Sequence, residues 1–286
     1  MKKYLALFTV VFAFYSCASG PGPDGEGPAA GKGEVKEPKL VSAQVPRLLK
    51  SVSYFSDDAV DEITVYSYEK NSAQPQKEET YDAYNTLQER IVNKYEDGKL
   101  ISREYYDSFN SLVSAKSFRY DGMRNMIQEN FLDDTGKILM IYDYEYDAAG
   151  NKLQWKVSSP VIGLLAITEY VYKKGKVISI NSYDTGGALA DMFEYDYKKD
   201  NPVKFTHYDA GSNLLNYSKF EYDDNDHLAK QLKYRKNNSV EMSEEFEYDG
   251  DGNIIGKKVY DSSGNLRQRF SYEYEMVRTE IWTREY

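Results

Sequence analysis

Apolar and polar residues alternate along most of the chain. In the segment LRQRFSYEY, one side of an extended chain would carry Leu266, Gln268, Phe270, Tyr272 and Tyr274, and the other Arg267, Arg269, Ser271 and Glu273. A two-residue period is typical of a β-strand. The segments 189–197 and 240–248 alternate in the same phase. The pattern predicts strands with one aromatic face and one charged face.

Aromatic positions recur at intervals of 25 or 26 residues, in two interleaved series. The first series is Tyr95, Tyr120, Tyr146, Tyr172, Tyr197, Tyr222, Tyr248 and Tyr274. The second is Tyr81, Tyr106, Leu132, Ser158, Tyr183, Tyr208, Tyr234 and Tyr260. An apolar residue follows each member of the second series six positions later, namely Leu87, Leu112, Ile138, Leu164, Leu189, Leu214, Val240 and Leu266. This regularity predicts a repeat architecture in which each period contains two turns.

The turns have the composition of β-hairpin turns. YDAAGNKL at Tyr146, YDGDGNII at Tyr248 and YDSSGNL at Tyr260 place Asp at the start and Gly three residues later. Asp can cap the turn backbone, and Gly adopts a left-handed conformation without steric cost. We therefore expect an all-β fold: an antiparallel meander of roughly 17 strands that begins near Val52. A curled single sheet, a solenoid-like form and a partly closed barrel all satisfy the pattern. A membrane barrel is disfavoured, since the short segment 228–234 carries two lysines.

The N-terminal region has the features of an export signal. Lys2 and Lys3 precede a short apolar run that ends at Ser16, and Cys17 is the single cysteine of the chain. This region resembles the lipobox of bacterial lipoproteins, and the resemblance implies that Cys17 carries the lipid. The Gly/Pro-rich stretch that follows favours a flexible tether. The expected organisation is a signal peptide at 1–16, a lipidated Cys17 with its tether at 17–45, and a repeat domain at 46–286.

Charge and composition exclude several classes of function. The net charge of −10 opposes binding to nucleic acid. With two histidines and one cysteine, the chain has few of the side chains that bind metals, and we expect neither a metal site nor a cofactor. His207 and His227 favour solvated turn positions over catalysis, and DGDGN at Asp249 favours a β-turn over a calcium loop. Because Asp recurs at every turn, the pair Asp223 and Asp224 is weak support for a glycosidase.

One segment departs from the repeat. SSPVIGLLAI, residues 158–167, replaces the Tyr-Asp turn with Pro160 and an apolar run. It is either an inserted loop buried against the sheet or an exposed contact patch. The candidate contact residues are Val161, Ile162, Leu164 and Leu165.

The YDxxGN motif, complete at Tyr146 and Tyr260, resembles the YD repeats of Rhs-type and teneurin-like proteins over roughly residues 81–275. This resemblance implies a β-shell in an exported protein, often linked to carbohydrate binding. We expect a lipid-anchored protein of the bacterial cell envelope, at the cell surface or the periplasmic face of the outer membrane. It would be a non-enzymatic binding or adhesion module for an unidentified protein or glycan. A periplasmic envelope scaffold or assembly factor and a carbohydrate-active enzyme are the alternatives. The tyrosine rows are expected to pack as a core or to stack on sugar rings.

Overall fold

The structure, a computed structural model, describes residues 37–283. The expected signal peptide, Cys17 and most of the expected tether lie outside the described residues. The described part contains eighteen strands. They are β1 (Lys39–Phe55), β2 (Val60–Tyr68), β3 (Pro75–Asp82), β4 (Leu87–Glu96), β5 (Lys99–Asp107), β6 (Leu112–Tyr120), β7 (Met126–Asp133), β8 (Ile138–Tyr146), β9 (Lys152–Ser159), β10 (Gly163–Lys173), β11 (Lys176–Tyr183), β12 (Leu189–Lys198), β13 (Asn201–Asp209), β14 (Leu214–Tyr222), β15 (Leu228–Arg235), β16 (Val240–Tyr248), β17 (Ile254–Asp261) and β18 (Leu266–Thr283). No helix of residues 37–283 is long and apolar enough to cross a membrane.

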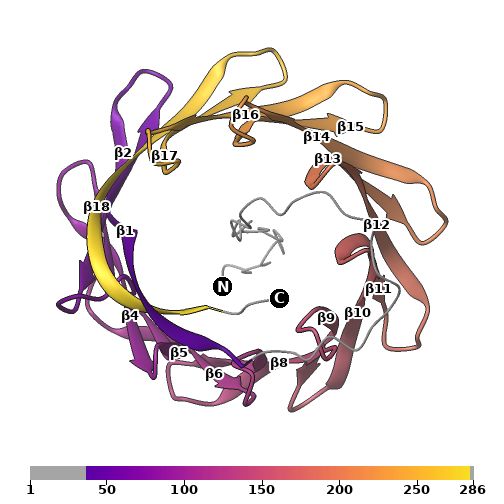
Figure 1. Cartoon of the computed structure of the whole chain (residues 1–286), viewed down its shortest axis with the longest axis horizontal. Helices are drawn as coiled ribbons and strands as arrows, with labels where there is room; N and C mark the ends of the chain where they lie inside the picture. The colour runs from indigo at the N-terminus through magenta and orange to yellow at the C-terminus, as the bar shows by residue number, and fades with distance from the viewer. Residues whose placement is uncertain (1–36, 284–286) are drawn as a thin grey trace. The chain divides into compact units, whose positions relative to one another are not determined.

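The sheet closes on itself. Each strand pairs antiparallel with the next, and β1 pairs with both β2 and β18, which completes a ring (Figure 1). The all-β meander is confirmed, and of the forms left open by the sequence the barrel is the one adopted. It is fully closed and has one strand more than expected. β1 begins at Lys39, ahead of the expected start near Val52 and inside the stretch assigned to the tether.

The strand connections lie at two rims. Rim A holds the connections that follow β2, β4, β6, β8, β10, β12, β14 and β16, and rim B holds those that follow the odd-numbered strands β1 to β17. β1 and β18 extend past rim A as a two-stranded ribbon, in which Lys39 to Leu48 pair with Thr283 to Tyr274. In Figure 1 this ribbon curves along the inner side of the ring near β4, β5 and β6.

The turns have the expected chemistry. At Asp147, the backbone N–H of Gly150 donates to the Asp147 carbonyl at 3.0 Å, and the Asp147 carboxylate accepts from the N–H groups of Ala149 and Asn151. Gly150 has a φ of 84°, in the left-handed region that glycine enters at no steric cost. The same bonds recur at Asp133, Asp209 and Asp261. The predicted Asp cap is confirmed at these four turns, and the predicted left-handed Gly at three of them, whereas Ser212 takes that position in the Asp209 turn with a φ of 60°.

The six-residue spacing of the second series also has a structural explanation. Each member forms a cross-strand pair with its apolar follower next to a rim B turn, as in Tyr81 with Leu87 and Tyr260 with Leu266. Ser158 with Leu164 forms the same pair in the irregular segment. The six-residue spacing is therefore the distance in sequence between the two residues that flank a rim B hairpin turn.

The alternation divides the wall into two faces. In β12, Phe193, Tyr195 and Tyr197 are half-buried, whereas Glu194 and Asp196 between them are exposed. Side chains converge on the concave side of a closed sheet, so its inner face is the more covered one. We therefore assign the tyrosine face to the inside of the ring, which we call the inner wall, and the charged face to the outside, which we call the outer wall.

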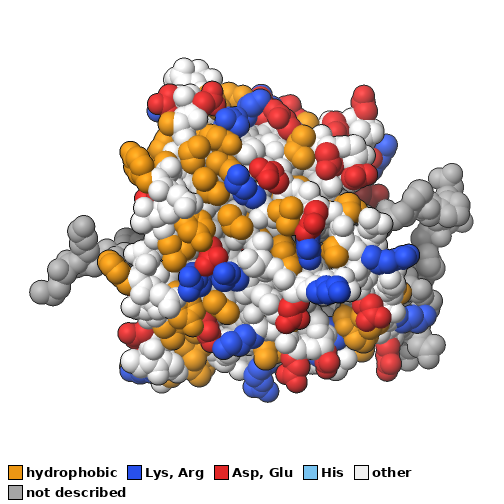
Figure 2. Space-filling view, turned by 90° about the vertical axis from the view of Figure 1, so that its left-hand side faces the viewer, with side chains coloured by type: hydrophobic (Ala, Val, Ile, Leu, Met, Phe, Trp, Pro, Cys, Tyr) orange, Lys and Arg blue, Asp and Glu red, His pale blue; other side chains and the backbone are white. Residues whose placement is uncertain are grey.

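The outer wall is held by ion pairs between neighbouring strands. Lys156 lies 2.7 Å from Glu145, and Lys258 lies next to Glu247 in the same way. Figure 2 shows acidic and basic side chains side by side over the outside of the wall. Such exposed pairs each stabilise the fold by at most about 1 kcal/mol. Their main consequence is a hydrated outer surface.

The inner wall is a lining rather than a packed core. Within residues 37–283 only five apolar side chains are buried, and no side chain is less than 2% exposed. Val157, Ile180 and Phe220 belong to the inner wall, whereas Val52 and Tyr217 lie on the outer wall. Barrels of about 16 to 18 strands are too wide for the side chains of their walls to meet across the middle. The aromatic rings of the inner wall consequently keep part of their surface uncovered.

Candidate binding surfaces

Tyrosine hydroxyls connect successive hairpins along rim A. In each even strand from β2 to β16, a tyrosine at the last or next-to-last position donates to the backbone carbonyl twenty residues earlier, at 2.5 to 3.1 Å. The donors are Tyr68, Tyr95, Tyr120, Tyr146, Tyr172, Tyr197, Tyr222 and Tyr248. We call these contacts the rim A latches. Each fixes a ring against the inner wall with its hydroxyl already bonded.

Burial is the main cause of altered pKa values among these tyrosines. It raises the pKa of Tyr68, Tyr146 and Tyr222 to about 12, with smaller contributions from neighbouring tyrosines and charged groups. The phenols are therefore neutral at physiological pH and act as hydrogen-bond donors to the backbone. The inner wall presents neutral aromatic surface at rim A.

Deeper in the ring the aromatic residues contact one another. Phe193 stacks on His207 with ring centroids 4.3 Å apart and on Phe205 at 5.4 Å. Tyr195 packs against Phe205 at 4.8 Å. Tyr195 remains part-exposed. The sequence left open whether such rows form a core or a platform, and in the structure they form an uncovered, partly wet layer.

Polar side chains interrupt this layer at defined places. Glu129 lies 2.7 Å from Lys116 and accepts from the Tyr144 hydroxyl at 3.2 Å. The Lys152 ammonium lies 4.6 Å from the centroid of the Tyr144 ring and 6.0 Å from that of Tyr170. Burial lowers the pKa of Lys152, and within residues 37–283 it forms no ion pair. The inner wall thus offers aromatic faces together with a few hydrogen-bonding groups.

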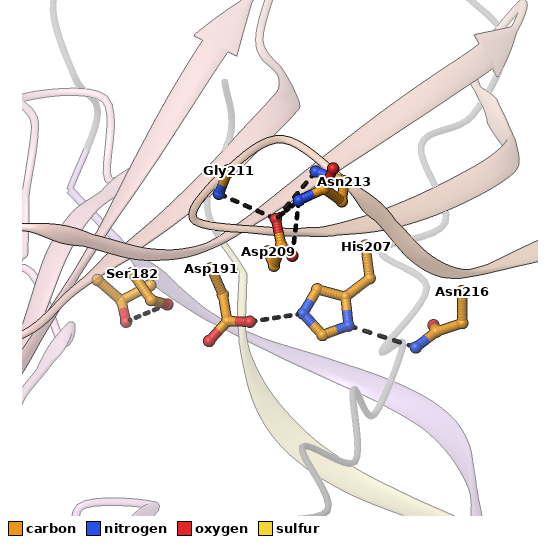
Figure 3. Close-up of polar contacts among 8 residues, drawn as sticks. Ser182, Asp191, His207, Asp209, Gly211, Asn213 and Asn216 are labelled. Carbon is orange, nitrogen blue, oxygen red and sulfur yellow. Dashed lines mark hydrogen bonds and ion pairs between the residues drawn. The ribbon is translucent and has the colours of Figure 1, made fainter. Parts of the chain in front are cut away.

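His207 is the centre of a polar cluster on the inner wall (Figure 3). Its Nε2 lies 2.8 Å from an Asp191 carboxylate oxygen, and its Nδ1 lies 3.4 Å from the Asn216 amide nitrogen. Ser182 is bonded instead to Thr168, at 3.2 Å. Both ring nitrogens of His207 are therefore engaged by neighbouring side chains, which hold the ring in place. It lies within β13, not in a turn as expected from the sequence.

The acidic motifs are turns. Asp249 of DGDGN accepts from the backbone N–H groups of Asp251 and Asn253, as the β-turn interpretation requires. Asp223 accepts from the N–H groups of Asn225 and His227, and the His227 ring stacks on Tyr248 at 4.7 Å. Within residues 37–283, no cluster of three or more His, Cys, Asp or Glu could hold a metal ion.

The irregular segment forms an exposed tip on rim B. Val161 and Ile162 occupy the turn between β9 and β10 and are 81% and 74% exposed. Leu164 is partly exposed, and Leu165 is half-buried at a register shift in β10. Of the two interpretations of this segment, the exposed patch is the one the structure adopts, and the buried loop is wrong because the β9–β10 hairpin keeps the ordinary two-strand path.

Two further apolar tips share rim B with this turn. Tyr84 is 90% exposed and Phe109 is 86% exposed, in the turns that follow β3 and β5. Sequence analysis missed both. The signal was present in DAYN and DSFN, where an aromatic residue stands at the third turn position that holds Thr135 or Gly211 in other turns.

A cleft of about 1070 Å³ lies between the terminal ribbon and rim A. Trp282 of β18 packs against the Arg124 guanidinium, 4.0 Å from the ring centroid. Arg47 of β1 donates to the Ser72 carbonyl at 3.1 Å. The sequence could not reveal this cleft, because it joins residues 278–282 to turns more than 150 positions earlier.

Comparisons with known proteins give distant structural likenesses. No family model matches the chain, and no curated protein matches it. A porin-like protein from Bacteroides uniformis has a TM-score of 0.45 at 9% identity, covering 79% of this chain and 96% of that one. A porin-like protein from Bacteroides vulgatus has a TM-score of 0.25 at 10% identity, covering 81% and 99%. The TcdB2-TccC3 structure has a TM-score of 0.23 at 11% identity, and the match spans 84% of this chain but 20% of that one. These values are too low to support an argument about function, and the YD-repeat resemblance continues to rest on the turn sequences.

Proposed function

We propose that this protein is a non-enzymatic binding protein of the bacterial cell envelope, which receives a glycan on its inner wall. The observation that carries the proposal is the layer of part-exposed aromatic rings on the inner wall, in which the rim A tyrosines are bonded to the backbone and Tyr195 and Phe205 pack on each other deeper in the ring. Such rings are fixed in position and lose little conformational entropy when a ligand stacks on them. The export signal and Cys17 are the support for a lipid anchor in the envelope.

The outer wall supports a hydrated setting for the barrel. Its strands carry cross-strand ion pairs in their middle parts, for example Arg90 with Glu79 and Lys230 with Glu245. A charged residue on a lipid-facing wall costs about 2 to 4 kcal/mol near the bilayer centre. The barrel as a soluble body held by a lipid anchor is therefore the arrangement that we propose.

Two matched pairs of aromatic residues test the inner wall. Tyr195 and Phe205 lie on the inner wall, and Tyr217 and Tyr234 stack on the outer wall at 4.7 Å. Binding of the full chain to an array of neutral and acidic oligosaccharides is measured before and after replacement of each pair by leucine. We expect loss of glycan binding for Tyr195→Leu with Phe205→Leu, and retained binding for Tyr217→Leu with Tyr234→Leu. Equal binding by both double variants, each with an unchanged circular dichroism spectrum, would contradict the proposal.

The anchor is tested separately from the barrel. Lipidation of Cys17 should move the protein into the detergent phase of a Triton X-114 extraction. Cys17→Ser should leave it in the aqueous phase. Protease treatment of intact cells and of detergent-opened cells then distinguishes a surface position from a periplasmic one.

A second candidate function is an envelope scaffold that contacts a protein through rim B. It is favoured by the exposed apolar side chains Tyr84, Phe109, Val161 and Ile162, which stand at the tips of three rim B hairpins. Val161→Asp should release a co-purifying envelope partner without unfolding the barrel. Phe55→Asp, on the same rim, is the control for a general effect of charge.

A carbohydrate-active enzyme has less support. The turn aspartates are occupied by their own backbone N–H groups, and backbone hydrogen bonds lower the pKa of Asp209 and Asp261. A glycosidase needs one carboxyl group whose pKa is raised so that it can donate a proton. Hydrolysis of a bound glycan by the pure protein would overturn this assignment.

A further inference from the structure

The cleft between the terminal ribbon and rim A has a well-defined floor. The Gln74 amide donates to the Gly98 carbonyl at 2.8 Å, and Arg124 donates to the Asp97 carbonyl at 2.6 Å. A Cβ atom at Gly98 would lie 3.5 Å from the Trp282 ring, so the indole packs close to this turn. The two hydrogen bonds join successive turns of rim A, and Trp282 fastens the ribbon to the turns that hold Gly98 and Arg124. The cleft lies between these contacts.

The charges around the cleft are arranged differently from those of the outer wall. Four basic side chains line it, and within residues 37–283 none of them forms an ion pair. They are Lys70, Lys99, Arg124 and Arg278. On the outer wall, by contrast, basic side chains such as Lys94 and Lys156 lie against carboxylates. Because Glu69, Asp97 and Glu280 belong to the same lining, the cleft holds four basic and three acidic side chains and is locally positive on a protein with a net charge of −10, which favours an anion there.

The same cleft presents aromatic surface and hydrogen-bonding groups. The hydroxyls of Tyr95 and Tyr120 belong to the rim A latches, so their rings are held in place along the lining. Trp282 is 42% exposed. Asp97 and Glu280 also line the cleft, and carboxylates accept hydrogen bonds from sugar hydroxyls. Aromatic faces, acceptors and unpaired cations together match a pyranose ring that carries an anionic group.

We propose that this cleft binds an acidic saccharide. Its pyranose face lies on the rim tyrosines Tyr95 and Tyr120, because Arg124 already covers one face of Trp282, and its carboxylate is held by Arg124, Lys99 and Arg278. The cleft volume of about 1070 Å³ accommodates a short oligosaccharide rather than a single sugar. A long polyanion is disfavoured because the rest of the molecule repels it. The site shares Tyr95 and Tyr120 with the rim A end of the inner wall but contains neither Tyr195 nor Phe205, so it can be tested independently of the proposed function.

The test is isothermal titration calorimetry of the full chain with tri-galacturonic acid, and with the neutral galactose trimer as the matched ligand. We expect the acidic trimer to bind and the neutral one to bind at least about tenfold more weakly, since a charge-assisted hydrogen bond contributes roughly 1.5 to 3 kcal/mol. Arg124→Gln and Arg278→Gln should each weaken binding by about tenfold. Arg269→Gln, remote from the cleft and packed on Tyr54, should leave binding unchanged.

Arg278→Gln is the decisive variant, because the Arg278 side chain forms no ion pair within residues 37–283 and its loss leaves the Arg124–Trp282 contact intact. Unchanged binding by this variant, or equal binding of the acidic and neutral trimers, would overturn the proposal. The Tyr195→Leu and Phe205→Leu double variant should still bind tri-galacturonic acid. Its failure to do so, with the cleft variants unaffected, would place the acidic saccharide on the inner wall instead.

Discussion

The two rims use similar turns but differ in what the adjoining tyrosine does. At rim A, Tyr146 lies on the inner wall and its hydroxyl donates to the Met126 carbonyl of the preceding hairpin at 2.8 Å. At rim B, Tyr106 lies on the outer wall and donates to Glu104 of its own strand at 2.9 Å. The rim A tyrosines therefore join one hairpin to the next through the backbone, whereas Tyr106 at rim B bonds to a side chain of its own strand. The Tyr-Asp motif alone does not determine which of these roles a tyrosine has.

Strands β1 and β18 add to the difference between the two rims. The ribbon of β1 and β18 lies against rim A and adds Arg47 and Trp282 to it, while the tips of rim B, such as Tyr84, project into solvent. Rim A is thus the end of the barrel that the terminal ribbon covers, whereas the tips of rim B are exposed.

Removal of a whole rim A side chain should have the largest effect on stability. Tyr222→Ala deletes a half-buried ring and the hydrogen bond to the Pro202 carbonyl, and we expect it to reduce the free energy of unfolding by about 3 kcal/mol. Tyr84→Ala, at the tip of a rim B turn, should change it by less than about 0.5 kcal/mol. Urea denaturation followed by circular dichroism measures both. Equal losses for the two variants would show that the rims do not differ in stability.

High pH should destabilise the rim A end. The pKa of Tyr68, Tyr146 and Tyr222 is raised by burial to about 12, against about 10 in the unfolded chain. A raised pKa contributes stability that is complete below pH 10 and is lost as the pH rises from about 10 to 12. Thermal melts across this interval should show a falling Tm. A Tm that stays constant up to pH 12 would mean that these phenols ionise as readily in the folded chain as in the unfolded one.

Loss of a single hydroxyl should have a smaller effect. Tyr146→Phe retains the ring but removes the latch to Met126, and we expect a loss of about 1 kcal/mol. Tyr106→Phe removes a part-buried contact within one strand at rim B, and we expect it to cost less than about half of that. The same urea measurement compares them. The account of the latches is wrong if Tyr106→Phe is the more damaging of the two.

The apolar tips of rim B should be nearly irrelevant to folding. Phe109→Ser alters a side chain that is 86% exposed, so we expect a change below about 0.5 kcal/mol in the free energy of unfolding. Leu112→Ser, at the base of the same hairpin and paired with Tyr106, is the control that should destabilise the barrel. A large loss of stability in Phe109→Ser would mean that rim B tips are packed rather than free.

Much of the wall could be predicted from the sequence because its determinants are local. The turn at Asp147 and the pairing of Tyr81 with Leu87 depend on residues within six positions of each other. The two-residue alternation likewise determines which side chains share a face. These features can be predicted without knowing whether the sheet closes.

Closure and the rim A cleft depend on distant residues and could not be predicted in the same way. Whether eighteen strands form an open or a closed sheet depends on twist and register accumulated over the whole array. The segment 39–48 has no Tyr-Asp turn to mark it as a strand, and it is ordered by pairing with residues 274–283. The contact between Trp282 and Arg124 depends on closure of the ring, which brings β18 next to the first strands.

The central claim is that the inner wall binds the ligand, and tyrosine nitration tests it most directly. The full chain is treated with tetranitromethane, with and without the oligosaccharide that it binds best on the array, and modified residues are mapped by mass spectrometry. The account predicts that the ligand protects inner-wall tyrosines such as Tyr195 and leaves the outer-wall Tyr208 as reactive as before. Protection of Tyr208 with no change at Tyr195 would contradict it.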